Sequence, residues 1–124
     1  MLRLLCVDDE QHITHAFERF CRNEGIRMFK ASSAGEALQI LEHETVDLIV
    51  SDYHMPGKSG LELLHEVHLR WPRVAGFIAS GFLELPKISN ALKEGYIQGF
   101  LQKPWKREEL KELIGRAEKH ADLM

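Results

Sequence analysis

The sequence contains little of what would place it in several large classes of protein. Its 124 residues include only two cysteines, Cys6 and Cys21, too few for a disulfide framework and not spaced like zinc ligands. Both lie in apolar patterns, so we expect buried free thiols. No apolar run approaches the roughly 18 residues of a membrane-spanning helix, and none has the form of a signal peptide. We therefore expect a cytoplasmic protein without a membrane segment.

An excess of charge of one sign, internal repeats and linkers are also lacking. Sixteen Lys and Arg stand against nineteen Asp and Glu, which gives a formal net charge of -3. Without a basic excess, we predict no direct binding to nucleic acid. Hydrophobic residues make up 44% of the chain, enough for one core at this length and not for two. Residues 1–124 are therefore expected to form a single domain.

Strand-like and helix-like patterns alternate from one end of the chain to the other. Strand-like runs occupy residues 2–7, 26–31, 46–51, 74–79 and 99–102, and the first, apolar except for one Arg, is typical of a strand covered on both faces. Each run is followed by apolar residues at helical spacing. Ser33 and Ser59 each precede a glutamate by three residues, which is the capping-box pattern of a helix start. This alternation predicts an α/β fold with a five-stranded parallel sheet and helices on both faces.

Polar residues follow four of the predicted strands, at the sheet edge where ligands bind in folds of this kind. They are the acidic run 8-DDE-10, Asp52, the pair Ser80-Gly81 and the pair Lys103-Pro104. One such residue would mean little, because acids after strands often only cap the next helix. Four at the same edge of one sheet indicate a functional site.

The chemistry of these residues suits phosphoryl transfer. At about 5 Å, each ionised pair among Asp8, Asp9 and Asp52 would repel by roughly 3 kcal/mol. Lys103 would offset part of that repulsion, and Mg²⁺, which prefers oxygen ligands, would offset more. A carboxylate beside such a cation can act as a nucleophile and form an aspartyl phosphate.

Four motifs together resemble the receiver domain of two-component response regulators. They are 7-VDDE-10, 52-DYHMPGKSGLELL-64, 79-ASG-81 and 100-FLQKPW-105. The resemblance covers roughly residues 2–120. It implies a flavodoxin-like, CheY-like fold: a doubly wound (βα)5 three-layer sandwich with strand order 2-1-3-4-5. It also implies a phosphoacceptor switch that receives its phosphoryl group from a sensor histidine kinase or a phosphotransfer protein.

The resemblance assigns roles at the acidic end of the site. Asp52 matches the phosphoacceptor. Asp9 matches the main Mg²⁺ carboxylate, and Asp8 matches its acidic partner. The backbone carbonyl of His54 matches a further metal ligand.

The resemblance also assigns the parts of the switch. Lys103 matches the lysine that pairs with the phosphoryl group, and the Lys103–Pro104 bond is often cis in this family. Ser80 matches the hydroxyl that closes on the phosphoryl oxygens, and Phe100 matches the aromatic that then changes rotamer. The side chains of His54 and Phe82 are expected to border the site, where they would tune the rate of phosphoryl loss.

The chain departs from the common pattern near its carboxyl end. The segment 95-GYIQGFLQKPW-105 carries one extra residue, and Trp105 follows the Lys-Pro pair. This form resembles receivers fused to HD-GYP-type phosphodiesterases and some attached to transcription activators. The chain is expected to be either complete or the amino-terminal receiver of a longer protein. Receivers often use the fourth helix, fifth strand and fifth helix for dimerisation or output contacts, so 106-KREELKELIGRAEKH-120 is either a solvated helix face or a partner surface.

Two other functions are weighed against the switch. A phosphohydrolase using an aspartyl phosphate would need a second carboxylate just after Asp52, where this chain has His54. We therefore expect no enzyme beyond chemistry at its own aspartate. A degenerate receiver that only binds partners would have lost Asp52, an acid of the first strand end or Lys103, and none is lost.

Two histidine pairs have a spacing that could bind a metal. His12 and His15 lie in the first predicted helix, and His65 and His68 lie in the third. In the implied fold these helices lie on opposite faces of the sheet, so the pairs cannot form one site. We predict ordinary surface histidines.

Overall fold

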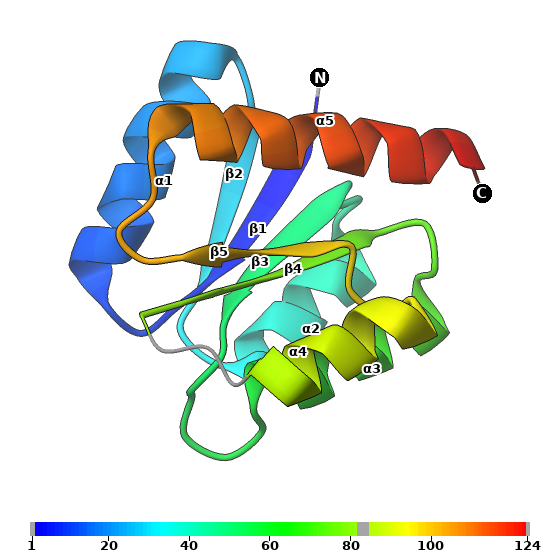
Figure 1. Cartoon of the computed structure of the whole chain (residues 1–124). Helices are drawn as coiled ribbons and strands as arrows, with labels where there is room; N and C mark the ends of the chain where they lie inside the picture. The colour runs from blue at the N-terminus through cyan, green and yellow to red at the C-terminus, as the bar shows by residue number, and fades with distance from the viewer. Residues whose placement is uncertain (1, 82–84, 124) are drawn as a thin grey trace.

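Five parallel strands form one sheet in the computed structural model, which describes residues 2–81 and 85–123. The strand order is β2-β1-β3-β4-β5 (Figure 1). The strands are β1 (Arg3–Val7), β2 (Arg27–Ala31), β3 (Leu48–Asp52), β4 (Ala75–Ser80) and β5 (Gly99–Gln102). The predicted fold class and strand order are confirmed.

The helices alternate with the strands and cover both faces of the sheet. They are α1 (Gln11–Glu24), α2 (Ala34–His43), α3 (Gly60–Arg70), α4 (Leu85–Glu94) and α5 (Arg107–Leu123). Helices α1 and α5 lie on one face, and α2, α3 and α4 lie on the other (Figure 1). The expected separation of α1 from α3 is therefore confirmed. Within the described residues, no helix combines the length and the apolar character that crossing a membrane requires.

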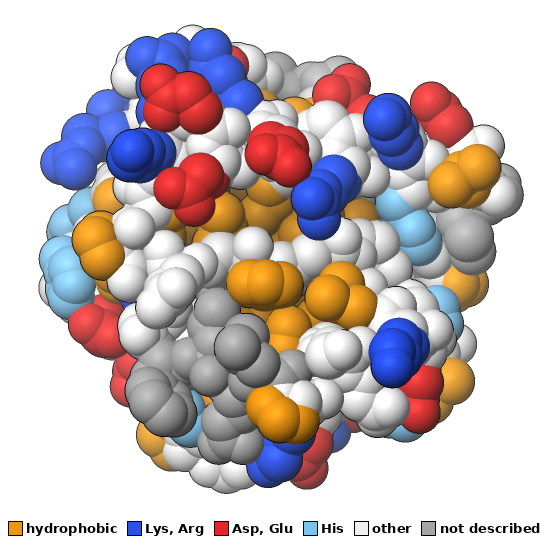
Figure 2. Space-filling view, viewed as in Figure 1, with side chains coloured by type: hydrophobic (Ala, Val, Ile, Leu, Met, Phe, Trp, Pro, Cys, Tyr) orange, Lys and Arg blue, Asp and Glu red, His pale blue; other side chains and the backbone are white. Residues whose placement is uncertain are grey.

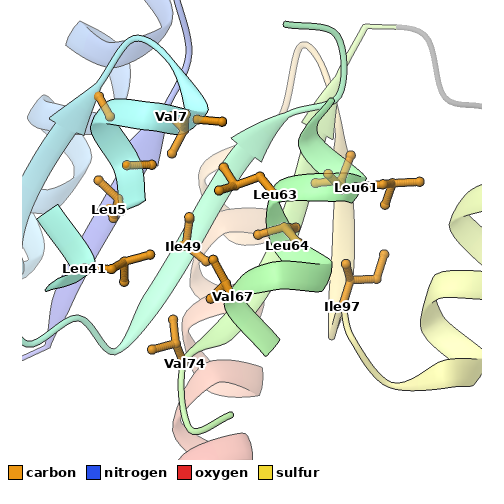
Figure 3. Close-up of a cluster of buried hydrophobic side chains, with 14 of the residues drawn as sticks. Leu5, Val7, Leu41, Ile49, Leu61, Leu63, Leu64, Val67, Val74 and Ile97 are labelled. Carbon is orange, nitrogen blue, oxygen red and sulfur yellow. The ribbon is translucent and has the colours of Figure 1, made fainter. Parts of the chain in front are cut away.

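Alternate side chains of the central strands feed two separate cores. On the α3 side, Leu5 and Ile49 pack with Leu64 and its neighbours, as Figure 3 shows. On the opposite side, Cys6 lies in the cluster that also contains Cys21. Both cysteines are free and buried, as predicted. Burial raises the pKa of the Cys21 thiol to about 11, so this thiol stays protonated at neutral pH.

The helix starts show which local signals the fold uses. At α3 the capping box is complete, because Ser59 and Glu62 each accept a hydrogen bond from the other's backbone N–H. At α2 the prediction is only half right. Ser33 caps the Glu36 N–H, but the Glu36 carboxylate accepts the backbone N–H of Ser32 at 2.8 Å in place of that of Ser33. The glutamate thus holds the chain one residue further from the helix.

Candidate functional site

Two buried aspartates meet where β1 and β3 end. Val7 is paired with Ser51 in the sheet, so the next residue of each strand, Asp8 and Asp52, lies at the same edge. Only 5% of Asp8 and 8% of Asp52 is exposed. Two carboxylates that lie at the same sheet edge and are shielded from water need a compensating positive charge.

Lys103 supplies that compensation. Its ammonium group donates a hydrogen bond to Asp8 Oδ2 at 2.9 Å and lies 3.7 Å from Asp52 Oδ1. The Lys103 backbone N–H donates to the carbonyl of Ser80 at 2.9 Å, which ties the lysine to the end of β4. The Lys103–Pro104 peptide bond is cis, as the family resemblance implied. One ammonium group therefore partly neutralises the carboxylates at the ends of two strands.

Glu10 joins these aspartates in an oxygen-rich group. Oxygens of Asp8, Glu10 and Asp52 all lie within 4.8 Å of one another. An all-oxygen donor set of high negative charge suits Mg²⁺, so these residues fit the predicted ion. Asp9 is exposed and lies outside this group. We did not assign Glu10 a role from the sequence, and its only sequence signal was membership of the acidic run 8-DDE-10.

Burial sets the protonation behaviour of Asp52. The pKa of its carboxyl is raised, chiefly by burial and also by the charge of Asp8, while Lys103 acts in the opposite direction. Burial alone would lower the pKa of Lys103, but the hydrogen bond with Asp8 and the charge of Asp52 outweigh it and raise the pKa. Lys103 is therefore an ammonium ion at neutral pH, poised beside the acidic group.

The raised pKa of Asp52 predicts how pH affects stability. The folded chain keeps the Asp52 proton to a higher pH than the unfolded chain does, so it loses stability as pH rises through the folded pKa. The variant Asp52→Asn does not ionise and escapes this loss. In chelator-treated buffer we expect it to exceed the parent in unfolding free energy at about pH 7, and by less at about pH 3.5. Urea unfolding at both pH values measures this, and an advantage that grows toward acid would contradict it.

The two predicted switch residues lie in the neighbouring strands β4 and β5. Ser80 ends β4 and is 3% exposed, and Phe100 in β5 is 42% exposed. His54 is exposed, with its ring 4.7 Å from that of Tyr53. Phe82 lies outside the described residues. The roles of Ser80 and Phe100, and the metal contact of the His54 carbonyl, stay predictions.

The histidines of the two pairs lie on α1 and α3, at exposed or half-buried positions. The group of potential metal ligands found among those residues contains no histidine. His12 Nε2 lies 3.4 Å from Glu10 Oε2. The ring of His65, on α3, lies 4.7 Å from that of Tyr96, with the two rings tilted relative to each other. These contacts agree with the prediction of surface histidines.

Comparison with known proteins assigns this geometry to a family. Residues 4–115 match the response regulator receiver domain. The hydrogenase transcriptional regulatory protein HoxA of Cupriavidus necator is 34% identical over 114 residues, which cover 92% of this chain and 23% of HoxA. The chain thus spans less than a quarter of that relative.

Two solved structures superpose closely. The signal receiver domain of an HD domain-containing protein from Pseudomonas fluorescens is 30% identical, with a TM-score of 0.89 and coverage of 98% of this chain and 89% of that one. The response regulator TrrA of Thermotoga maritima, solved in complex with Mg²⁺ and BeF, is 26% identical, with a TM-score of 0.83 and coverage of 94% and 99%. With the family match and the buried Asp8–Asp52–Lys103 group, they lead to one conclusion: this chain belongs to the response regulator receiver domains of two-component systems.

Proposed function

We propose that Asp52 is the phosphoacceptor of this receiver domain and takes its phosphoryl group from a phosphohistidine. The donor would be a sensor histidine kinase or a phosphotransfer protein. The observation that carries the proposal is the buried Asp52 carboxylate, 3.7 Å from the Lys103 ammonium and inside a group of three acids. A carboxylate buried in this way at a strand end lowers the stability of the fold. A role as phosphoacceptor explains why the chain keeps it there.

The chain's own residues account for the transfer. An oxygen of Asp52 attacks phosphorus, the bond between phosphorus and the donor's imidazole nitrogen breaks, and the imidazole keeps the electron pair. The Lys103 ammonium stabilises the negative charge on the phosphoryl oxygens. Mg²⁺, held by Asp8, Asp52 and a further acid, would neutralise charge on the same oxygens. We propose that this further acid is Asp9 and that the backbone carbonyl of His54 is another ligand of the ion, as the family resemblance implies.

The switch would then act through β4, β5 and α4. We propose that the Ser80 hydroxyl closes on the phosphoryl oxygens and that Phe100 moves inward in response. Phe100 is 42% exposed in this structure, so its ring can become more buried when it moves inward. Phosphorylation would thereby shift a two-state equilibrium at the surface around Phe100.

We propose that this surface binds a partner or a second copy of the chain. Figure 2 shows charged side chains along α5 above a band of hydrophobic ones between α5 and α4. A pocket of about 160 Å³ lies here, and Phe77, Phe100, Leu113 and Arg116 are among the residues that line it. We propose an output domain as the partner, either a transcription activator or an HD-GYP-type phosphodiesterase. HoxA is a transcriptional regulatory protein, and the Pseudomonas fluorescens receiver belongs to an HD domain-containing protein; both support the proposal of an output domain.

We propose no catalysis beyond the chain's own aspartate. A phosphohydrolase would use a second carboxylate two residues after the nucleophile, where His54 stands. The degenerate alternative, an interaction module that takes no phosphate, is less well supported because Asp8, Asp52 and Lys103 are all present and in contact.

Beryllofluoride, a phosphoryl mimic, tests the proposal. The protein is mixed with beryllofluoride with and without Mg²⁺, and Trp105 fluorescence is followed. Trp105 lies two residues from Lys103 and its ring is 4.8 Å from that of Phe17, so it is well placed to report on the site. Replacing Trp71 by Phe removes the background signal from the other tryptophan. We expect a Mg²⁺-dependent change. If none is seen and acetyl phosphate adds no mass, the degenerate module is favoured.

A further inference from the structure

Glu10 is oriented toward the phosphorylation site and does not serve its helix. It is the N-cap residue of α1, yet its side chain makes no capping hydrogen bond. The shorter acid Asp commonly accepts a backbone N–H of the first turn from this position, whereas the longer Glu10 does not. Its two oxygens are directed elsewhere. Oε1 lies 3.9 Å from the Lys103 ammonium, and Oε2 lies 3.4 Å from the ring of His12.

A backbone hydrogen bond holds Glu10 in this orientation. Its N–H donates to Asp8 Oδ1 at 2.9 Å, while Asp8 Oδ2 accepts from Lys103 at 2.9 Å. Asp8 therefore bridges the backbone of Glu10 and the ammonium of Lys103. The intervening Asp9 is exposed and outside the group. The chain turns so that the first and third acids of 8-DDE-10 share the site.

The charge balance indicates what Glu10 contributes. When ionised, Asp8, Glu10 and Asp52 carry three negative charges, and Lys103 returns one, which leaves two. Glu10 supplies one of these two charges, so it strengthens the attraction of this group for a divalent cation. Without Glu10 the excess would be one.

We propose that Glu10 is a further carboxylate of the metal-binding group, beside the acids assigned above, and strengthens the binding of Mg²⁺ by the unphosphorylated domain. The inference rests on the function proposed above. Half of the Glu10 side chain is exposed, at 50%, so its contact with the ion is either direct or through a metal-bound water. Either contact orients the cation before a phosphoryl donor arrives.

Calorimetric titration with MgCl₂ alone, at constant ionic strength, tests this. We expect Glu10→Gln to weaken Mg²⁺ binding about tenfold, the lower end of the range for partners around a metal. Glu118→Gln is the matched control, because it removes the same charge from an exposed position on α5. Its Mg²⁺ affinity should equal that of the parent. The side chain of Glu10 packs against no core cluster, so the variant is expected to fold, and a circular dichroism melt verifies this.

The outcomes separate this inference from the proposed function. If the parent binds Mg²⁺ and Glu10→Gln binds it equally or more tightly, the inference is wrong while the proposed function stands. If Glu118→Gln loses as much affinity as Glu10→Gln, the effect is one of net charge and the inference is again wrong. If the parent itself binds no Mg²⁺, both fail. Asp9→Asn, titrated in parallel, tests the role that the family resemblance gives to Asp9.

Discussion

Replacing Asp52 with Asn is expected to abolish phosphoryl uptake from acetyl phosphate and to leave the fold intact. The neutral amide removes the nucleophilic carboxylate oxygen and changes almost no volume. The neighbouring buried acid, Asp8, is not a ready substitute. Asp8 is engaged by the Lys103 ammonium and by the backbone N–H of Glu10. We therefore expect incorporation to fall to background, a larger effect than any other single substitution at the site.

Intact-mass analysis after incubation with acetyl phosphate and Mg²⁺ measures this directly. Asp122→Asn is the matched control, because it makes the same chemical change at an exposed position near the end of α5. The control should gain one phosphoryl group as the parent does. Phosphate uptake that survives in Asp52→Asn would overturn the assignment of the phosphoacceptor.

Replacing Gly60 with Ala is expected to cost the fold about 3 kcal/mol of unfolding free energy, the upper end of the range for overpacking. Gly60 is the first residue of α3 and packs directly against the end of β3. A methyl group there would press into the carbonyl oxygen of Asp52 and lie 3.0 Å from the Ile78 side chain. The obstacle is backbone, which cannot rotate away as a flexible side chain could. The backbone that would have to move is that of the phosphoacceptor, Asp52.

Gly115→Ala is the matched control for this substitution. Gly115 lies inside α5, and an added methyl group there would meet nothing within 4 Å. Alanine is the better helix former, so this variant should gain about 0.5–1 kcal/mol. Urea unfolding of the parent and both variants measures the two effects. Equal stability of Gly60→Ala and the parent would mean that the backbone at the end of β3 shifts without cost.

The architecture could be predicted from the sequence because its signals are local. Short apolar runs alternate with amphipathic patterns, and breakers such as Gly25 mark the ends. Gly25 closes α1 with a φ of 69°, a backbone conformation that favours glycine. The position of Asp52 was equally accessible, because a charged residue at the tip of a buried strand interrupts a strong pattern. Lys103 could be identified by the same reasoning at the end of β5.

Details that depend on side-chain direction could not be predicted in this way. The capping box at Ser59 formed as expected, but Glu36 accepts its second hydrogen bond from Ser32 and not from Ser33. The spacing of Ser33 and Glu36 is the same as that of Ser59 and Glu62. The difference lies in the path by which the chain enters each helix, which the spacing does not specify.

Hydrophobic periodicity determines the succession of strands and helices along the chain. The points where polar residues interrupt this periodicity identify the residues at each strand end. Both are properties of the sequence itself. Which acids of 8-DDE-10 face Lys103 does not follow from any pattern. It depends on how the turn after β1 directs three consecutive carboxylates, and on a lysine 95 positions beyond Asp8 that reaches back across the sheet edge. Electrostatic contact is a matter of distance in space, so the folded chain selects Asp8 and Glu10 from three similar acids.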